Sequence, residues 1–144
     1  MTDKSPSINR HRAFSETLKK NGVKCIDYIW NTKQRTEEYH QQMNKLFDEY
    51  PEMDAMFSED LIIMNALKCA GERGMCIPDE FKAVGYDGTL IAKISYPSMT
   101  YVSQPIKELA DTLVDVLLKK INGAKLHEDI ILKDVCLVKG QTTE

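Results

Sequence analysis

The sequence has 144 residues, of which 42% are apolar and 28% are charged, with a net charge of −3 and a pI of about 5.7. This length and composition are typical of one globular domain with its own core, which excludes extended disorder. The net negative charge argues against a domain that binds nucleic acid by itself, because such domains are basic. No apolar run reaches the length of a membrane span.

The cysteines, the histidines and the opening segment bear on metal binding and on compartment. The four cysteines form no C-x-x-C pair, and no histidine stands near one of them at the spacing of zinc ligands. We therefore expect reduced thiols, no metal site and no cofactor. The polar opening residues MTDKSPSINRHR do not resemble a signal peptide, so a cytoplasmic location is expected. The cysteines are Cys25, Cys69, Cys76 and Cys136.

The first third of the chain predicts a helix, a strand and a second helix. The first helix is expected over about Asn9–Lys20, ended by the capping pair Asn21-Gly22, and the strand over Val23–Trp30. The second helix opens at Thr36 and ends at Pro51. It carries one apolar stripe, formed by Tyr39, Met43, Leu46, Phe47 and Tyr50.

The middle of the chain predicts a short buried strand and an unusually apolar helix. The strand spans Met53–Ser58, and the helix spans Leu61–Arg73 before Gly74 ends it. Apolar residues surround most of this helix, so we expect burial on more than one side. The helix is therefore either central in the fold or turned toward another subunit. Its apolar residues are Leu61, Ile62, Ile63, Met64, Ala66, Leu67, Cys69 and Ala70.

The second half continues the alternation of strands and helices. A turn at Pro78-Asp79 precedes a strand over Phe81–Tyr86, and a further strand is expected over Met99–Ser103. A helix begins after Pro105, continues at helical spacing through Ile121 and is capped by Asn122-Gly123. A last strand is predicted over Ile130–Val138.

This alternation predicts an α/β fold with a parallel sheet. Ligands bind such sheets where strands end and helices begin. The polar residues at the expected strand ends are therefore the candidate binding positions: Trp30-Asn31, Ser58-Glu59-Asp60 and Asp87-Gly88.

Four segments in chain order match motifs that occur together in one protein family. Arg10–Phe14 (RHRAF) is similar to R-x-x-G-[FYW], and Pro51–Asp60 (PEMDAMFSED) to P-x-x-D-A-[IVL]-[FV]-x-x-N-D. Gly74–Gly88 is similar to G-x-x-[IV]-P-x-D-[IVF]-x-[VI]-[VI]-G-[FY]-D, and Tyr96–Pro105 to P-x-L-T-T-[VI]-x-Q-P. The closing Leu137–Thr142 resembles L-V-x-R-x-S-T. The chain thus resembles the effector-binding domain of LacI/GalR-family transcriptional repressors.

The resemblance implies a fold and a division of the chain. The fold is the three-layer, parallel-sheet architecture of type I periplasmic binding proteins, which this chain would contain only in part. Residues 1–104 would form the C-terminal subdomain without its first strand. Residues 105–144 would form a crossover, with a helix of the N-terminal subdomain and a returning terminal strand. The family's DNA-binding helix-turn-helix has no counterpart in the sequence, so operator DNA would be bound only through a part outside it.

The resemblance also implies an effector site. Arg10 and Asp87 align with positions that contact effector in the family, where a guanidinium fork and a carboxylate suit sugar oxygens and hydroxyls. Glu59 replaces a common asparagine and can only accept hydrogen bonds, whereas Asp60 is expected to cap the next helix. The family's stacking aromatic aligns with Lys33, so Trp30 either stacks on a sugar or packs in its strand. The candidate effector-binding residues are Arg10, Trp30, Lys33, Glu59, Asp87 and Gln104.

These features predict a sugar-sensing part of a repressor rather than an enzyme. The effector would be a sugar or sugar phosphate, and the apolar helix would form a homodimer through Leu61, Ile62, Met64, Asn65, Leu67 and Lys68. The alternative is a stand-alone sugar-binding module without a regulatory role. A receiver-like protein lacks support because its N-terminal acidic cluster is missing. Glu59 and Asp87 as a glycosidase pair find little support, and no phosphate loop or G-x-S-x-G elbow occurs.

Overall fold

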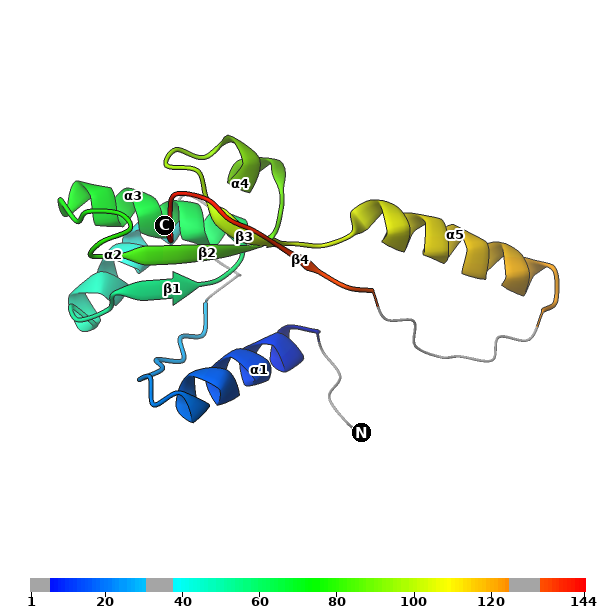
Figure 1. Ribbon diagram of the computed structural model, residues 1–144, viewed down its shortest axis with the longest axis horizontal. Coiled ribbons are helices and arrows are strands. Elements are labelled where there is room, and N and C mark those ends of the chain that lie inside the picture. Colours follow the sequence, from blue (N-terminus) through cyan, green and yellow to red (C-terminus); the bar gives the residue numbers. More distant parts are fainter. Residues whose placement is uncertain (1–5, 31–37, 125–132) are drawn as a thin grey trace. The chain divides into compact units, whose positions relative to one another are not determined.

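The computed structural model describes residues 6–30, 38–124 and 133–144. Its chain divides into two compact units, Met1–Lys33 and Gln34–Glu144, and each is described by itself (Figure 1). The boundary predicted after residue 104 rests on the resemblance and stays a prediction.

The first unit contains helix α1, Pro6–Lys20, and the segment that follows it. The predicted cap at its end is confirmed. Gly22 has a φ of 70°, its N–H donates to Lys19 O at 3.1 Å, and the N–H of Val23 donates to Leu18 O at 3.0 Å. This pair of bonds is a Schellman motif, in which a glycine takes the left-handed position that ends the helix.

The strand predicted over Val23–Trp30 is wrong, because residues 23–30 form no strand in the structure. Apolar alternation gives a segment the tendency to extend, but a strand exists only where a neighbouring strand completes its hydrogen bonds. Side chains order the segment instead. Asp27 lies 2.7 Å from the His11 ring, and the Tyr28 and Trp30 rings meet edge to face with centroids 5.9 Å apart.

The second unit is built on a four-stranded sheet in the order β1-β2-β3-β4 (Figure 1). The strands are β1 (Ala55–Phe57), β2 (Lys82–Asp87), β3 (Thr100–Ser103) and β4 (Cys136–Val138). The first three run parallel, which confirms the predicted α/β sheet, whereas β4 returns antiparallel to β3. The sequence placed the end of this last strand correctly but did not give its direction; residues 130–132 of the prediction lie outside the described residues.

Helices α2 (Tyr39–Glu49) and α3 (Asp60–Glu72) supply most of the core beside the sheet. α2 packs on α3, and α3 packs on β1 and β2. The predicted stripe of α2 is confirmed, because Met43, Leu46 and Phe47 are buried, and Phe47 meets Phe81 with ring centroids 5.2 Å apart. The short helix α4, Leu90–Ile94, was not predicted.

The apolar helix α3 is central in this chain. Its buried residues include Ile62, Ile63, Ala66 and Leu67, and Cys69 is fully buried. Of the two alternatives left open by the sequence, a central position therefore accounts for most of the apolar excess. The helix ends as predicted at Gly74, with a φ of 75° and a second Schellman pair of bonds.

Helix α5, Ile106–Ile121, has no buried residue. It begins after Pro105 and ends before Asn122 and Gly123, as predicted. Its apolar side chains are exposed in this chain. The exposed residues are Ile106, Leu113, Val114, Leu117, Leu118 and Ile121. No helix among the described residues is both long and apolar enough to cross a membrane.

The C-terminal residues 140–143 fasten the two central strands at their amino ends. Thr142 is fully buried, and its hydroxyl donates to Ala83 O at 2.7 Å while it accepts from the N–H of Thr100 at 2.8 Å. The N–H of Ala83 donates to Thr142 O at 3.1 Å. Gly140 lies so close that an added Cβ would be 2.5 Å from Ser98 O. These bonds hold β2 and β3 in register. The register in turn fixes the position of the carboxyl end of β2 relative to that of β3.

Candidate functional site

The carboxyl ends of β2 and β3 bring two of the predicted site residues into contact. Asp87 is the last residue of β2 and pairs with Ser103 in the register of β3. Gln104 follows β3, and its Nε2 donates to Asp87 Oδ1 at 2.5 Å. Both side chains are half-buried. The bond leaves one carboxylate oxygen of Asp87 and the amide oxygen of Gln104 as acceptors for a ligand.

The backbone at Asp87 is strained. Its φ is 108°, a region that residues with a side chain rarely adopt. Gly88 follows with a φ of 69°, and an added Cβ there would lie 2.9 Å from the Tyr101 ring. Asp87-Gly88 thus lies at the end of the strand, as predicted, and the backbone there requires glycine at the second position. Strain of this kind, of about 1–3 kcal/mol, is concentrated at binding and catalytic sites.

A buried carboxylate, Asp60, lies at the start of α3 behind this edge. Its Oδ2 accepts from the N–H and from the hydroxyl of Thr89, each at 2.7 Å. Its Oδ1 has no hydrogen-bond partner among the described residues. Gly85 provides the room for this carboxylate, because an added Cβ would come within 2.5 Å of Oδ1. Asp60 therefore joins α3 to the loop that follows β2.

The expectation that Asp60 caps α3 is wrong. The N-cap position belongs to Glu59, which makes no side-chain capping bond, and Asp60 is already the first helical residue. A helix-start aspartate usually bonds to its own helix, but here Thr89 offers two donors from across the fold. The side chain follows the nearest pair of donors rather than the local backbone.

The remaining predicted site residues are distributed over both units. Glu59 is exposed on the loop after β1. Strand β1 ends at Phe57, which pairs with Val84, whereas β2 continues to Asp87. Arg10 lies half-buried in α1, where it donates to the Ser7 hydroxyl at 3.3 Å, and Trp30 packs on Tyr28 in the first unit. The predicted site residue Lys33 lies outside the described residues.

The predicted dimer residues divide into buried and accessible positions. Ile62 and Leu67 are 7% and 6% exposed, Leu61, Met64 and Asn65 are half-buried, and Lys68 is exposed. A shallow groove of about 420 Å³ runs over the accessible side of α3. It is lined by Met64, Asn65, Leu67, Lys68, Tyr96 and Pro97.

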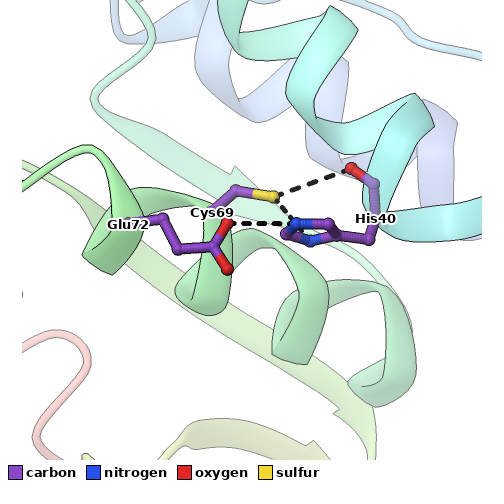
Figure 2. Close-up of side chains that lie close together, drawn as sticks. All are labelled: His40, Cys69 and Glu72. Atoms are coloured by element: carbon purple, nitrogen blue, oxygen red, sulfur yellow. Dashed lines mark hydrogen bonds and ion pairs between the residues drawn. The ribbon is translucent and has the colours of Figure 1, made fainter.

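A second cluster of polar side chains, which the sequence analysis did not identify, lies between α2 and α3. The His40 ring is 3.2 Å from Cys69 Sγ through Nδ1 and 3.0 Å from Glu72 Oε2 through Nε2 (Figure 2). Burial raises the pKa of the Cys69 thiol to about 11, and the nearby Glu72 carboxylate adds to the shift. Histidine and cysteine are 29 residues apart in the chain, which is why their spacing gave no signal.

Three other groups have shifted pKa values with clear causes. Burial, together with Asp27, raises the pKa of the Cys25 thiol, whereas the hydrogen bond from His11 lowers the pKa of Asp27. The carboxylate of Glu80 raises the pKa of the exposed Cys76 thiol.

The chemistry of this strand edge suits binding. A carboxylate accepts strongly from hydroxyl groups, and an amide both donates and accepts, so the two together match a molecule with several adjacent hydroxyls. The strand-end geometry is the one in which open α/β sheets hold ligands.

Comparisons with known proteins show the family of the chain. A family described as periplasmic binding protein-like domain matches residues 1–143. The chain is similar to the sucrose operon repressor of Streptococcus mutans, with 42% identity over 90 residues, 62% of this chain and 28% of that protein. It is also similar to the ribose operon repressor of Halalkalibacterium halodurans, with 30% identity over 123 residues, 85% of this chain and 37% of that protein.

A solved structure has the same fold. The Lac repressor dimer bound to operator and the anti-inducer ONPF matches with a TM-score of 0.77 and 26% identity, over 93% of this chain and 46% of that one. The chain thus spans less than half the length of each of these relatives. The operator and the anti-inducer ONPF are ligands of that Lac repressor dimer.

Proposed function

The chain belongs to the family of periplasmic binding protein-like domains of LacI-type regulators, and from this premise we propose that it forms part of the sugar-sensing domain of a transcriptional repressor. The observation that carries the proposal is the contact between Asp87 and Gln104 at the carboxyl ends of β2 and β3. The repressors of sucrose and ribose operons among its relatives support a carbohydrate as the effector.

In this proposal the strand edge binds hydroxyl groups of a sugar. Asp87 accepts hydrogen bonds from hydroxyls, and Gln104 holds the carboxylate in place through its amide. Contacts of the effector with Arg10, Trp30 and Lys33 stay predictions from the sequence. Glu59 supplies a further acceptor in place of the family's asparagine, which favours a neutral sugar over a sugar phosphate.

The site acts as a sensor rather than as a catalyst. A bound effector stabilises the conformation to which it binds more tightly and so shifts the balance between two arrangements of the whole protein. Operator DNA is contacted by a part outside this chain, as the relation to the operator-bound Lac repressor supports. Such a regulator acts in the cytoplasm, where its operator is.

The test is a screen of this chain by thermal denaturation against monosaccharides, disaccharides and sugar phosphates, followed by calorimetry of any compound that raises Tm. A ligand at 100 times its Kd stabilises the folded state by about 2.7 kcal/mol, which is a readily measured shift. We expect at least one neutral sugar to bind with 1:1 stoichiometry. If none of the compounds shifts Tm or gives heat, this chain does not hold the effector site.

We further propose that the accessible side of α3 forms a homodimer. The groove over Met64, Asn65 and Lys68 lies on the face that the fold leaves uncovered, and its lining is mainly apolar. The relative that binds operator does so as a dimer. Protein dimers that place an apolar helix face in their interface remove it from water on association.

A charge in this groove is expected to dissociate the dimer. Met64→Asp should convert the chain to a monomer in sedimentation-velocity runs, because the interface would bury an unpaired carboxylate. Ile94→Asp is the matched control, since Ile94 is 71% exposed and does not line the groove. Wild type that sediments as a monomer, or a dimer that survives in Met64→Asp, would exclude this interface.

A further inference from the structure

Three side chains with the ligand chemistry of a zinc site converge between α2 and α3. His40 lies in the first turn of α2, and Cys69 and Glu72 lie in the last turn of α3 (Figure 2). The nitrogen, sulfur and oxygen atoms that they offer all lie within 4.8 Å of one another. Cys69 and Glu72 are three residues apart on one helix, a spacing that places both side chains on the same face.

The distance between Cys69 Sγ and His40 Nδ1 is close to the separation of two ligand atoms in a tetrahedral zinc site. Zinc binds thiolate sulfur at about 2.3 Å and imidazole nitrogen at about 2.0 Å, so neighbouring ligand atoms are separated by about 3.5 Å. Here Cys69 Sγ is 3.2 Å from His40 Nδ1, and Glu72 Oε2 is 3.0 Å from His40 Nε2. Because Glu72 faces the other ring nitrogen, its flexible side chain must turn toward the sulfur side for one ion to contact all three.

Burial and exposure give this cluster one closed side and one open side. Cys69 is fully buried, whereas the His40 and Glu72 side chains are 30% and 48% exposed. An ion can therefore enter from solvent past Glu72 and reach the sulfur from outside. Three protein ligands with an open fourth position for water is a common zinc arrangement.

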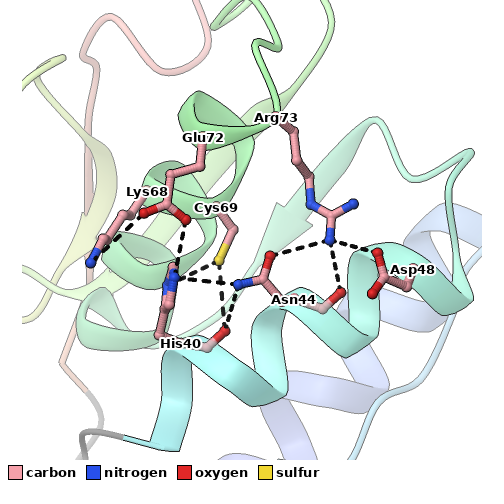
Figure 3. A network of polar contacts seen from close by, with 7 residues as sticks. All are labelled: His40, Asn44, Asp48, Lys68, Cys69, Glu72 and Arg73. Carbon is pink, nitrogen blue, oxygen red and sulfur yellow. Dashed lines mark hydrogen bonds and ion pairs between the residues drawn. The ribbon is translucent and has the colours of Figure 1, made fainter.

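The surrounding residues hold the histidine in place (Figure 3). Asn44 Nδ2 is 3.3 Å from His40 Nε2, and the Asn44 amide oxygen accepts from Arg73 at 3.2 Å. Arg73 also donates to Asp48 at 2.6 Å and lies over the Phe47 ring. Residues that orient a metal-binding side chain in this way strengthen metal binding, because the side chain is already held in place before the ion binds.

We propose that His40, Cys69 and Glu72 form a binding site for a zinc-like divalent ion that ties the first turn of α2 to the last turn of α3. On binding, the Cys69 thiol gives its proton to solvent and the sulfur, one imidazole nitrogen and one carboxylate oxygen coordinate the ion. The thiolate and carboxylate balance its two positive charges, which suits a site at the edge of the core. The sequence predicted no metal site because its ligands meet only when the two helices pack.

The test is titration of the untagged 144-residue chain, under a thiol-free reductant, with Co²⁺ and then Zn²⁺. One equivalent of Co²⁺ should give a thiolate-to-cobalt charge-transfer absorption and the visible bands of four-coordinate cobalt, and Zn²⁺ should displace both and raise Tm. Cys69→Ser should lose the charge-transfer absorption. Glu72→Gln, at an exposed position that leaves folding intact, should weaken Zn²⁺ affinity at least about tenfold.

The matched control is Cys76→Ser, which removes an exposed cysteine that bonds to Glu80 and is not part of the His40–Cys69–Glu72 cluster. This variant should retain the full cobalt spectrum and the wild-type zinc affinity. The proposal is overturned if wild type shows no charge-transfer absorption, if Cys69→Ser keeps it, or if Glu72→Gln binds zinc as tightly as wild type. The readouts need no sugar, so they are independent of the proposed function.

Discussion

Asp87→Ala is expected to weaken binding of the effector sugar on the order of 10- to 100-fold, the largest functional effect of any single substitution at the strand edge. The reason is that the carboxylate accepts hydrogen bonds from sugar hydroxyls, and each hydrogen bond to a charged group contributes about 1.5–3 kcal/mol. The substitution also leaves the Gln104 amide without the partner that holds it. Isothermal titration calorimetry with the sugar found by the screen measures the change in Kd.

Two further variants separate binding from folding in this experiment. Asp87→Asn keeps the shape of the side chain and tolerates the positive φ of 108° better than alanine, so its fold should be intact while its affinity falls. Asp79→Ala removes an exposed carboxylate at the turn before β2 and should bind as wild type does. An unchanged Kd in both Asp87 variants would show that the sugar does not contact this carboxylate.

Thr142→Val is expected to lower the free energy of unfolding by about 2–4 kcal/mol, the largest effect on stability that we predict for a substitution without change of shape. Valine fills the same volume but removes the hydroxyl that donates to Ala83 O and accepts from the Thr100 N–H, both of which are buried residues. A buried polar group that loses its partner costs about 1–3 kcal/mol. Urea denaturation followed by circular dichroism measures the loss.

Thr112→Val is the matched control for this prediction. Thr112 also donates its hydroxyl to a backbone oxygen, that of Glu108 at 2.7 Å, but at an exposed position on α5 where water replaces the lost donor. Its unfolding free energy should stay within about 0.5 kcal/mol of wild type. Equal losses in the two variants would mean that the C-terminal residues do not fasten β2 to β3.

Local chemistry was sufficient to predict the elements whose signals lie within one turn or one strand. The stripe of Met43, Leu46 and Phe47 defines α2, and Gly22 and Gly74 end their helices because only glycine takes the left-handed position without cost. The same holds for Asp87 at the end of β2, because aspartate and glycine are residues that favour turns. Its position is confirmed, whereas its contact with a sugar stays a prediction.

The amino-acid sequence was therefore sufficient for the approximate positions of α1, α2, α3, α5 and the four strands, for the family motifs and for the strand edge that carries Asp87. The tertiary structure decided the rest: that residues 23–30 form no strand, that β4 runs antiparallel, that Asp60 bonds to Thr89, and that His40 meets Cys69 and Glu72. Each of these features depends on a residue or strand about 15 to 40 positions away in the chain, or on the lack of a neighbouring strand at the described residues 23–30. Spacing along the chain carries no information on such pairs, because the packing of helices and strands brings them together.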